Sequence, residues 1–225
     1  MRYYPICLQI EGRRCLVIGG GKVAERKVRG LLDSGAEVAV ISPELTEGLA
    51  SLQAAGSIVW VPRGYQPDDV AGFFLVMAAT DDPQVQDRIQ DDAERHGILL
   101  NVADVPEKCT FILPALVRRG ALSLAISTSG KSPALAKKLR QDLEARLGPE
   151  YEVLVEVMGL LRPYIMQWGL PQADNEKIFQ GLVDGGILAH VERRDWPGLQ
   201  TYLEGGLQRE LPLALAAQLK KLLAQ

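Results

Sequence analysis

The sequence predicts an α/β protein: a Rossmann-like, doubly wound parallel sheet, then a small β-hairpin/helix segment and an all-α C-terminal tail. Three observations predict this fold class. Short apolar runs alternate with helical patterns over residues 15–102, a run of three glycines follows the first apolar run, and only helical patterns occur beyond residue 150.

Five apolar runs are expected to form parallel strands, because short continuous runs are typical of strands buried on both faces. They cover residues 15–18, 38–41, 58–61, 73–79 and 98–102. Residues 23–34 form a helical pattern that ends at Gly35, and Asp82-Pro83 opens another that ends at Gly97. Ser42-Pro43-Glu44 is expected to cap and begin the helix after the second strand.

After residue 102 the alternation of strands and helices gives way to a pattern typical of a β-hairpin. Residues 110–117 and 121–127 are β-rich, and Arg118-Arg119-Gly120 lies between them as the expected turn. Ser132-Pro133 is expected to cap a helix that stops at Gly148-Pro149. Helical patterns follow at 153–168, where Pro163 should kink or end the helix, at 177–192, briefly around 199, and at 213–223. These shifts divide the chain into a Rossmann-like domain (1–113), a connector segment (114–148) and a helical C-terminal domain (149–225).

Composition excludes several classes of protein. With 25 Lys+Arg against 28 Asp+Glu, no global basic field indicates nucleic-acid binding. No apolar run approaches the ~18 residues of a membrane span, and the N-terminus lacks the features of a signal peptide. Three cysteines without a CxxC pair and two histidines argue against disulfides and a zinc site. We therefore expect a cytoplasmic protein with reduced thiols and no metal ligands of its own.

The strongest motif is the glycine-rich turn after the first strand. Gly19, Gly21 and Ala24 fit the pattern G-x-G-x-x-G/A, which is typical of dinucleotide-binding turns at a helix N-terminus. The alternative is a glycine turn that serves only packing. The carboxylate that commonly binds the adenosine ribose is missing from its usual place, since Glu44 comes slightly late. Ser42 either bonds the ribose or only caps the next helix, and the lack of an arginine there favours NAD over NADP.

Acidic residues follow the fourth and fifth strands, where ligands of open α/β sheets bind. Asp82 before Pro83 is interpreted as a helix cap. Asp104 precedes Val105-Pro106, so it either begins a turn or takes a proton as hydride leaves a substrate.

A hydroxyl-rich segment precedes the connector helix. Residues 127–132 contain Gly-Lys-Ser, but Ala125 stands where a P-loop needs its first glycine, so that motif is rejected. The hydroxyls and the helix N-terminus still suit an anion. A basic cluster lies nearby and is either an ordinary solvated face or a polycarboxylate site: Arg118, Arg119, Lys131, Lys137, Lys138 and Arg140.

Taken together, GGGKVAERK, ATDD, NVAD, FILPA and SGKSP resemble the precorrin-2 dehydrogenase family, the NAD-dependent part of siroheme synthase, over about residues 4–146. The resemblance implies oxidation of precorrin-2 to sirohydrochlorin with NAD⁺, by a homodimer whose segments 114–147 interlock. Some relatives also insert Fe²⁺ into sirohydrochlorin, so ferrochelatase activity stays open. The rival interpretation is a nucleotide-sensing Rossmann regulatory module without catalysis.

The resemblance also implies roles for individual residues. Asp104 matches the general base. The cofactor phosphates would contact Gly19, Gly21, Lys22 and Val23, the adenosine end would meet Pro43 and Glu44, and the nicotinamide side would meet Thr80, Asp81 and Asn101. The tetrapyrrole and its carboxylates would meet Thr128, Ser129, Arg118, Arg119 and Lys131.

Overall fold

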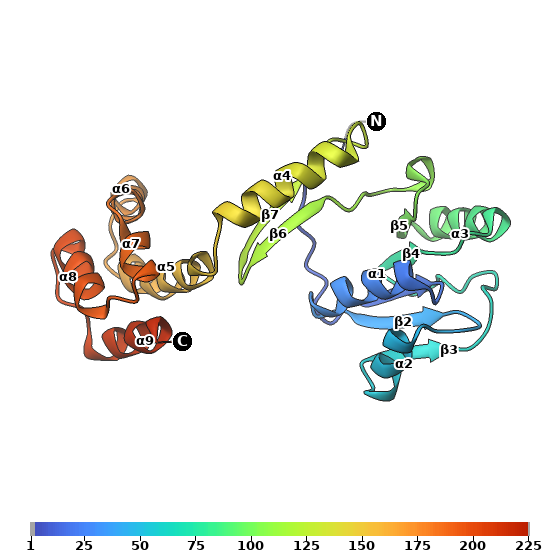
Figure 1. Cartoon of the computed structure of the whole chain (residues 1–225), viewed down its shortest axis with the longest axis horizontal. Coiled ribbons are helices and arrows are strands. Elements are labelled where there is room, and N and C mark those ends of the chain that lie inside the picture. The colour runs from blue at the N-terminus through green and yellow to red at the C-terminus, as the bar shows by residue number, and fades with distance from the viewer. Residues whose placement is uncertain (1–2, 225) are drawn as a thin grey trace. The chain divides into compact units, whose positions relative to one another are not determined.

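The computed structural model describes residues 3–224, and the chain divides into two compact units, Met1–Leu113 and Pro114–Gln225 (Figure 1). The first unit holds five strands in one parallel sheet of order β3-β2-β1-β4-β5. Its strands are β1 (Arg14–Ile18), β2 (Glu37–Ile41), β3 (Ile58–Val61), β4 (Leu75–Ala78) and β5 (Leu99–Val102). The prediction of a doubly wound parallel sheet is confirmed.

The register of the sheet brings the strand ends to one edge. Ile18 of β1 pairs with Ile41 of β2 and Ala78 of β4, and Ala78 pairs with Val102 of β5. The strand order reverses between β1 and β4, which is the switch point where such sheets bind ligands. Loops that follow these strands therefore meet at a single edge.

Helices cover both faces of the sheet because successive strand residues point to opposite sides. Val17 packs with α1 (Lys22–Leu32) and α2 (Glu47–Ala54), through side chains such as Val28 and Leu49. Leu16 packs on the other face with α3 (Pro83–His96), through Ile89. Asp82 caps α3 by accepting from the backbone N–H of residues 84 and 85, and Gly97 ends it in a left-handed conformation, as expected.

The helix after β2 begins later than expected. Residues 42–45 form a loop, and α2 starts at Glu47 with Thr46 as its N-cap. Ser42 is held by β3 instead, because Trp60 Nε1 donates to its carbonyl at 2.9 Å and its own N–H donates to Val61 O at 3.3 Å. The expectation that Ser42 and Pro43 begin this helix is wrong.

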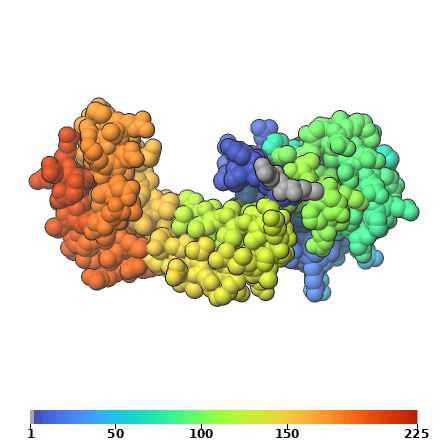
Figure 2. All heavy atoms as spheres, turned by 90° about the horizontal axis from the view of Figure 1, so that it is seen from above, coloured from blue at the N-terminus to red at the C-terminus, as the bar shows by residue number. Residues whose placement is uncertain are grey.

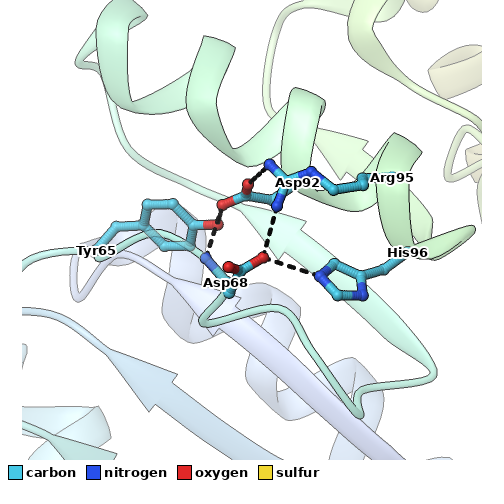
Figure 3. A network of polar contacts seen from close by, with 5 residues as sticks. All are labelled: Tyr65, Asp68, Asp92, Arg95 and His96. Carbon is cyan, nitrogen blue, oxygen red and sulfur yellow. Dashed lines mark hydrogen bonds and ion pairs between the residues drawn. The ribbon is translucent and has the colours of Figure 1, made fainter.

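A polar network ties the segment after β3 to α3 (Figure 3). Tyr65 Oη donates to Asp92 Oδ2 at 2.5 Å, and the backbone N–H of Asp68 donates to the same oxygen at 2.9 Å. Arg95 contacts both carboxylates, and His96 contacts Asp68. Burial works to raise the pKa of Asp92, but the hydrogen bonds outweigh it and hold that pKa below its usual range. The network therefore anchors the crossover between β3 and β4.

The second unit starts with an antiparallel hairpin, β6 (Ala115–Arg119) and β7 (Leu122–Ile126), followed by α4 (Pro133–Arg146) with Ser132 as N-cap. The turn is shorter than expected. Arg118 and Arg119 belong to β6, where they pair with Ser123 and Leu122, so Gly120 at φ +54° and Ala121 make the turn.

Five helices complete this unit, and Figure 2 shows their side chains, orange to red, gathered in one cluster. Buried leucines such as Leu161, Leu203 and Leu219 form their core. The helix expected over 177–192 is two helices, because Gly185 and Gly186 interrupt it and Gly186 takes φ +100°. The helices are α5 (Glu150–Met166), which continues past Pro163, α6 (Gln172–Asp184), α7 (Ile187–Glu192), α8 (Trp196–Leu207) and α9 (Leu213–Leu223).

Within residues 3–224, no helix combines the length and the apolar character needed to cross a membrane.

Candidate functional site

The glycine loop between β1 and α1 is built for close packing on two sides. A Cβ on Gly19, whose φ is +123°, would lie 2.4 Å from the carbonyl oxygen of Ala79 at the end of β4. A Cβ on Gly20 would lie 1.8 Å from the carbonyl oxygen of Glu44. Gly21 differs, since nothing lies within 4 Å of its Cβ position. The two first glycines therefore serve packing, and the third leaves the N-terminus of α1 open to an anion.

A groove of about 530 Å³ opens beside this loop, within the size range of ligand pockets. It brings together four residues expected at the cofactor, Gly21, Ser42, Pro43 and Glu44. Gly20, Leu45 and Thr46 complete its lining. Ser42 is only 7% exposed and its hydroxyl lies against Gly20, whereas Pro43 and Glu44 are exposed.

Two residues that the sequence analysis missed shape this groove. Thr46 Oγ1 donates to Glu25 Oε2 at 2.7 Å and accepts from Leu49 N at 3.3 Å. The hydrogen bond from Thr46, together with that from Arg29, holds the pKa of Glu25 below its usual range. This carboxylate therefore locks α1 against the start of α2. The signal was local and readable, since a threonine before a run of helix formers is a common N-cap.

Thr80 and Asp81 follow β4 at the same edge of the sheet. The carbonyl of Thr80 accepts from Gln86 Nε2 at 2.8 Å, and its hydroxyl accepts from Asp82 N at 3.3 Å. Asp81 is exposed. Since Ala79 touches Gly19, these two residues lie next to the glycine loop.

Asn101 at the end of β5 is 7% exposed, and both ends of its amide have partners. Its Oδ1 accepts from Lys27 Nζ at 2.6 Å, and its Nδ2 donates to Phe111 O at 3.1 Å. Burial lowers the pKa of Lys27, while the nearby Cys109 and Asp104 work in the opposite direction. The spacing of Lys27 from Val23 and Leu31, four residues each way, places it on the same helical face as these apolar residues. Its contact with Asn101, 74 residues away, has no local signal.

Asp104 is exposed in the turn after β5 and takes a left-handed φ of +61°. The turn is held by Cys109, whose Sγ accepts from Val102 N at 3.2 Å and contacts the carbonyl of Val105 at 3.3 Å. Both interpretations of Asp104 therefore agree with its position, because it shapes a turn and presents a carboxylate at the ligand-binding edge.

The residues expected at the substrate lie in the second unit, whereas Asp104 and the glycine loop lie in the first. Arg119 has a structural contact there: its guanidinium donates to the carbonyls of Leu147 and Glu144, which end α4. The hydroxyl of Thr128 accepts from Ser132 N at 3.1 Å. Ser129 takes φ +52°, so the hydroxyl-rich segment folds as a tight turn before α4. Lys131 belongs to this turn, because its N–H donates to the carbonyl of Thr128. Arg118 lies exposed on β6.

Among the described residues, no three His, Cys, Asp or Glu side chains are grouped so that they could hold a metal ion.

Two family models match the chain. One is described as putative NAD(P)-binding and covers residues 6–115. The other is the sirohaem biosynthesis protein central model, over residues 119–146. The first covers nearly all of the first unit, and the second runs from Arg119 through β7 to the end of α4.

Comparisons with curated relatives and with a solved structure are consistent with these two family models. The chain is 38% identical over 221 residues to siroheme synthase of Nitrosococcus oceani, covering 93% of this chain and 46% of that protein. It is 42% identical over 194 residues to siroheme synthase 3 of Aeromonas hydrophila, covering 86% and 42%. The chain thus spans less than half the length of these relatives. The fold matches that of SirC, precorrin-2 dehydrogenase, with a TM-score of 0.69, 24% identity and 99% of each chain covered. The chain therefore belongs to the sirohaem biosynthesis family that these models and relatives represent, with an NAD(P)-binding first unit.

Proposed function

We propose that this protein oxidises precorrin-2 to sirohydrochlorin, with NAD⁺ as the hydride acceptor and Asp104 as the proton acceptor. One observation carries the proposal. The open N-terminus of α1 at Gly21 and the turn that presents Asp104 lie at the same carboxyl edge of the sheet. Family membership and the name of the solved relative with the same fold support the substrate.

The groove fits the cofactor. The vacant Cβ position of Gly21 leaves room for a diphosphate against the N–H groups of Lys22 and Val23 in the first turn of α1. Gly19 contributes by keeping β4 close to this turn. Ser42, Pro43 and Glu44 would hold the adenosine end. Bound there, NAD⁺ supplies the hydride acceptor, and the protein supplies orientation and a base.

NAD⁺ is proposed over NADP⁺ because of the charge beside the groove. Its lining contains the carboxylate of Glu44 and no lysine or arginine. A carboxylate repels the 2′-phosphate of NADP⁺, which arginine commonly binds in related sites. Calorimetric titration should show at least about tenfold tighter binding of NAD⁺, equivalent to about 1.4 kcal/mol. Equal affinities would contradict this preference.

The residues of the chain are proposed to accept a proton and to position the reactants. The carboxylate of Asp104 accepts the proton that leaves the substrate together with the hydride. Thr80 and Asp81, beside the glycine loop, would contact the nicotinamide side. Asn101 would act at this side through the loop that it holds, since its amide already contacts Lys27 and Phe111.

The substrate carries many carboxylates, for which Arg118, Lys131 and the hydroxyls of Thr128 and Ser129 are proposed partners. Arg119 is proposed to act indirectly, because its guanidinium holds the end of α4.

A homodimer is also proposed, through the face of the connector. Leu116 of β6 and Leu135 and Leu139 of α4 are exposed, by 39%, 50% and 40%. The hairpin is a two-stranded sheet, whose outer edges a second copy would cover. Analytical ultracentrifugation should give a dimer for the parent chain and a monomer for Leu139→Glu. A monomeric parent chain would contradict the proposal.

The test of function is an anaerobic assay of NADH and sirohydrochlorin formation from precorrin-2 and NAD⁺. Asp104→Asn keeps the left-handed turn, which asparagine tolerates, and should lower kcat about 10²-fold or more. Asp82→Asn is the matched control, because asparagine also caps helices and turnover should stay within about twofold. NAD⁺ binding without turnover would refute the dehydrogenase and favour a nucleotide-sensing module. Adding Fe²⁺ in the same assay tests for ferrochelatase activity.

A further inference from the structure

Lys27 is a lysine whose charge is directed inward. It lies on α1, two turns after the glycine loop, and its half-buried side chain reaches the end of β5. There its Nζ donates to Asn101 Oδ1 at 2.6 Å. Lysines on surface helices commonly keep their ammonium group in water, so this arrangement calls for a reason.

The direct partner of the ammonium is a neutral amide. The structure offers a comparison in the same unit, where half-buried Lys108 pairs with the carboxylate of Asp87 at 2.6 Å. Lys108 therefore has the contact expected of an ion pair that stabilises the fold. Lys27 has a partner that neutralises no charge, and burial of its ammonium is unfavourable.

The contact of Lys27 continues to the turn that carries Asp104. Asn101 Nδ2 donates to Phe111 O and contacts Cys109 Sγ at 3.7 Å. Cys109 in turn bonds Val102 and Val105, the two ends of that turn. The titratable groups that act on the ammonium are Arg26 on its own helix and, across from it, Asp104 and Cys109. Burial raises the pKa of the Cys109 thiol, so at neutral pH the attraction comes from the Asp104 carboxylate. Lys27 is therefore linked to Asp104 both through hydrogen bonds and by direct electrostatic attraction.

We infer that Lys27 is a positioning residue: in its ammonium form it orients the Asn101 amide and attracts the Asp104 carboxylate toward its working position. The inference rests on the proposed dehydrogenase function. It assigns Lys27 no contact with the cofactor or the substrate. Because positioning errors of about 1 Å cost about 10²-fold in rate, loss of this contact should act on kcat.

The kinetic test compares two replacements. Lys27→Met shortens the side chain by one atom and removes its charge, so kcat should fall at least about 10-fold. The KM for NAD⁺ should stay within about twofold. The melting temperature should fall only moderately, because the change leaves Asn101 Oδ1 without the donor that it has in the parent chain. Lys27→Arg should restore most of kcat. Lys108→Met is the matched control: it breaks an ion pair whose carboxylate is exposed, so the melting temperature should change little and kcat should stay within about twofold.

The pH profile separates positioning from packing. Burial lowers the pKa of Lys27, so kcat should fall on the alkaline side below the usual lysine value of about 10.4. In Lys27→Arg this fall should move to higher pH, since arginine keeps its proton. A Lys27→Met variant with unchanged kcat, or a Lys27→Arg variant with a kcat no higher than that of Lys27→Met, would overturn the inference.

A second readout does not depend on turnover. Carbon-13 NMR of the lysine side chains, with the Lys27 signal identified by its loss in Lys27→Arg, should show Lys27 releasing its proton at lower pH than the other lysines. A Lys27 signal that titrates at the same pH as the signals of the other lysines would overturn the inference. If the parent chain binds NAD⁺ but does not oxidise precorrin-2, the proposed function fails, and the NMR titration still decides whether Lys27 is held as described.

Discussion

Replacing Gly20 by alanine adds a methyl group where the structure has no space for it. The new Cβ would lie 1.8 Å from the carbonyl oxygen of Glu44 and 2.6 Å from Ser42 Oγ. Non-bonded heavy atoms keep about 3 Å or more apart, so the Glu44 carbonyl would have to move by about 1 Å. The atom in the way is backbone, and Thr46 N is bonded to the carbonyl of Gly20 at 2.9 Å, so the loop cannot turn aside freely.

The expected loss follows from the cost of overpacking. Inserting a group into a filled space typically costs about 1–3 kcal/mol, which for a domain of this size lowers the melting temperature by about 4–12 °C. The affinity for NAD⁺ should fall about tenfold or more, because Ser42, Pro43 and Glu44 line the groove that the displaced loop forms.

The assay is thermal denaturation followed by circular dichroism, with calorimetric titration of NAD⁺ on the same samples. Gly30→Ala is the matched control, since Gly30 lies within α1 and nothing lies within 4 Å of its Cβ position. That variant should gain up to about 1 kcal/mol from helix propensity and bind NAD⁺ normally. A Gly20→Ala protein with the melting temperature and NAD⁺ affinity of the parent chain would refute the role given to this glycine.

Three further predictions concern the rest of the molecule. Tyr65→Phe removes a donor to the buried carboxylate of Asp92 and should cost about 1.5–3 kcal/mol in urea denaturation at pH 7. Because the pKa of Asp92 is lowered in the folded state, this stabilisation is present above the unfolded value of about 3.9 and is lost as the pH falls through the folded value. The difference in unfolding free energy between the parent chain and Tyr65→Phe should therefore shrink in acid. A difference that is constant with pH would contradict the stabilising role given to the Tyr65–Asp92 hydrogen bond. Arg119→Met should expose the carbonyls that end α4, and hydrogen exchange in its last turn should speed up about fivefold, for a loss of about 1 kcal/mol; unchanged exchange would refute the capping role. Iodoacetamide at neutral pH should modify exposed Cys7 and leave buried Cys15, whose pKa burial raises to about 11, and mass spectrometry of the native protein would expose an error if both react alike.

Several elements were readable from the sequence because the chemistry that starts and ends them is local. Asp82-Pro83 and Gly97 bound α3 at both ends as expected, and Ser132-Pro133 begins α4. Apolar runs of four to seven residues predicted all five strands of the first sheet. The family motifs were equally readable, and the comparisons confirm the family that they indicated.

Other features needed the folded chain. Ser42 was expected either to bond the ribose or to cap the next helix, and it does not cap α2, because β3 holds its backbone. Arg119 looked like part of a turn, but it lies in β6 and donates to carbonyls at the end of α4, 25 and 28 residues away. The partner of Lys27 had no local signal, since Asn101 lies 74 residues along the chain.

The difference has a physical cause. Helix caps, hydrophobic periodicity and glycine turns depend on residues a few positions apart, so the sequence by itself determined the order of the elements and the glycine loop that opens α1. A hydrogen bond between distant side chains depends on strand register and on the path of each crossover. Only the tertiary structure therefore decided which side chains meet at the carboxyl edge of the sheet, where Lys27 meets Asn101 beside the turn of Asp104.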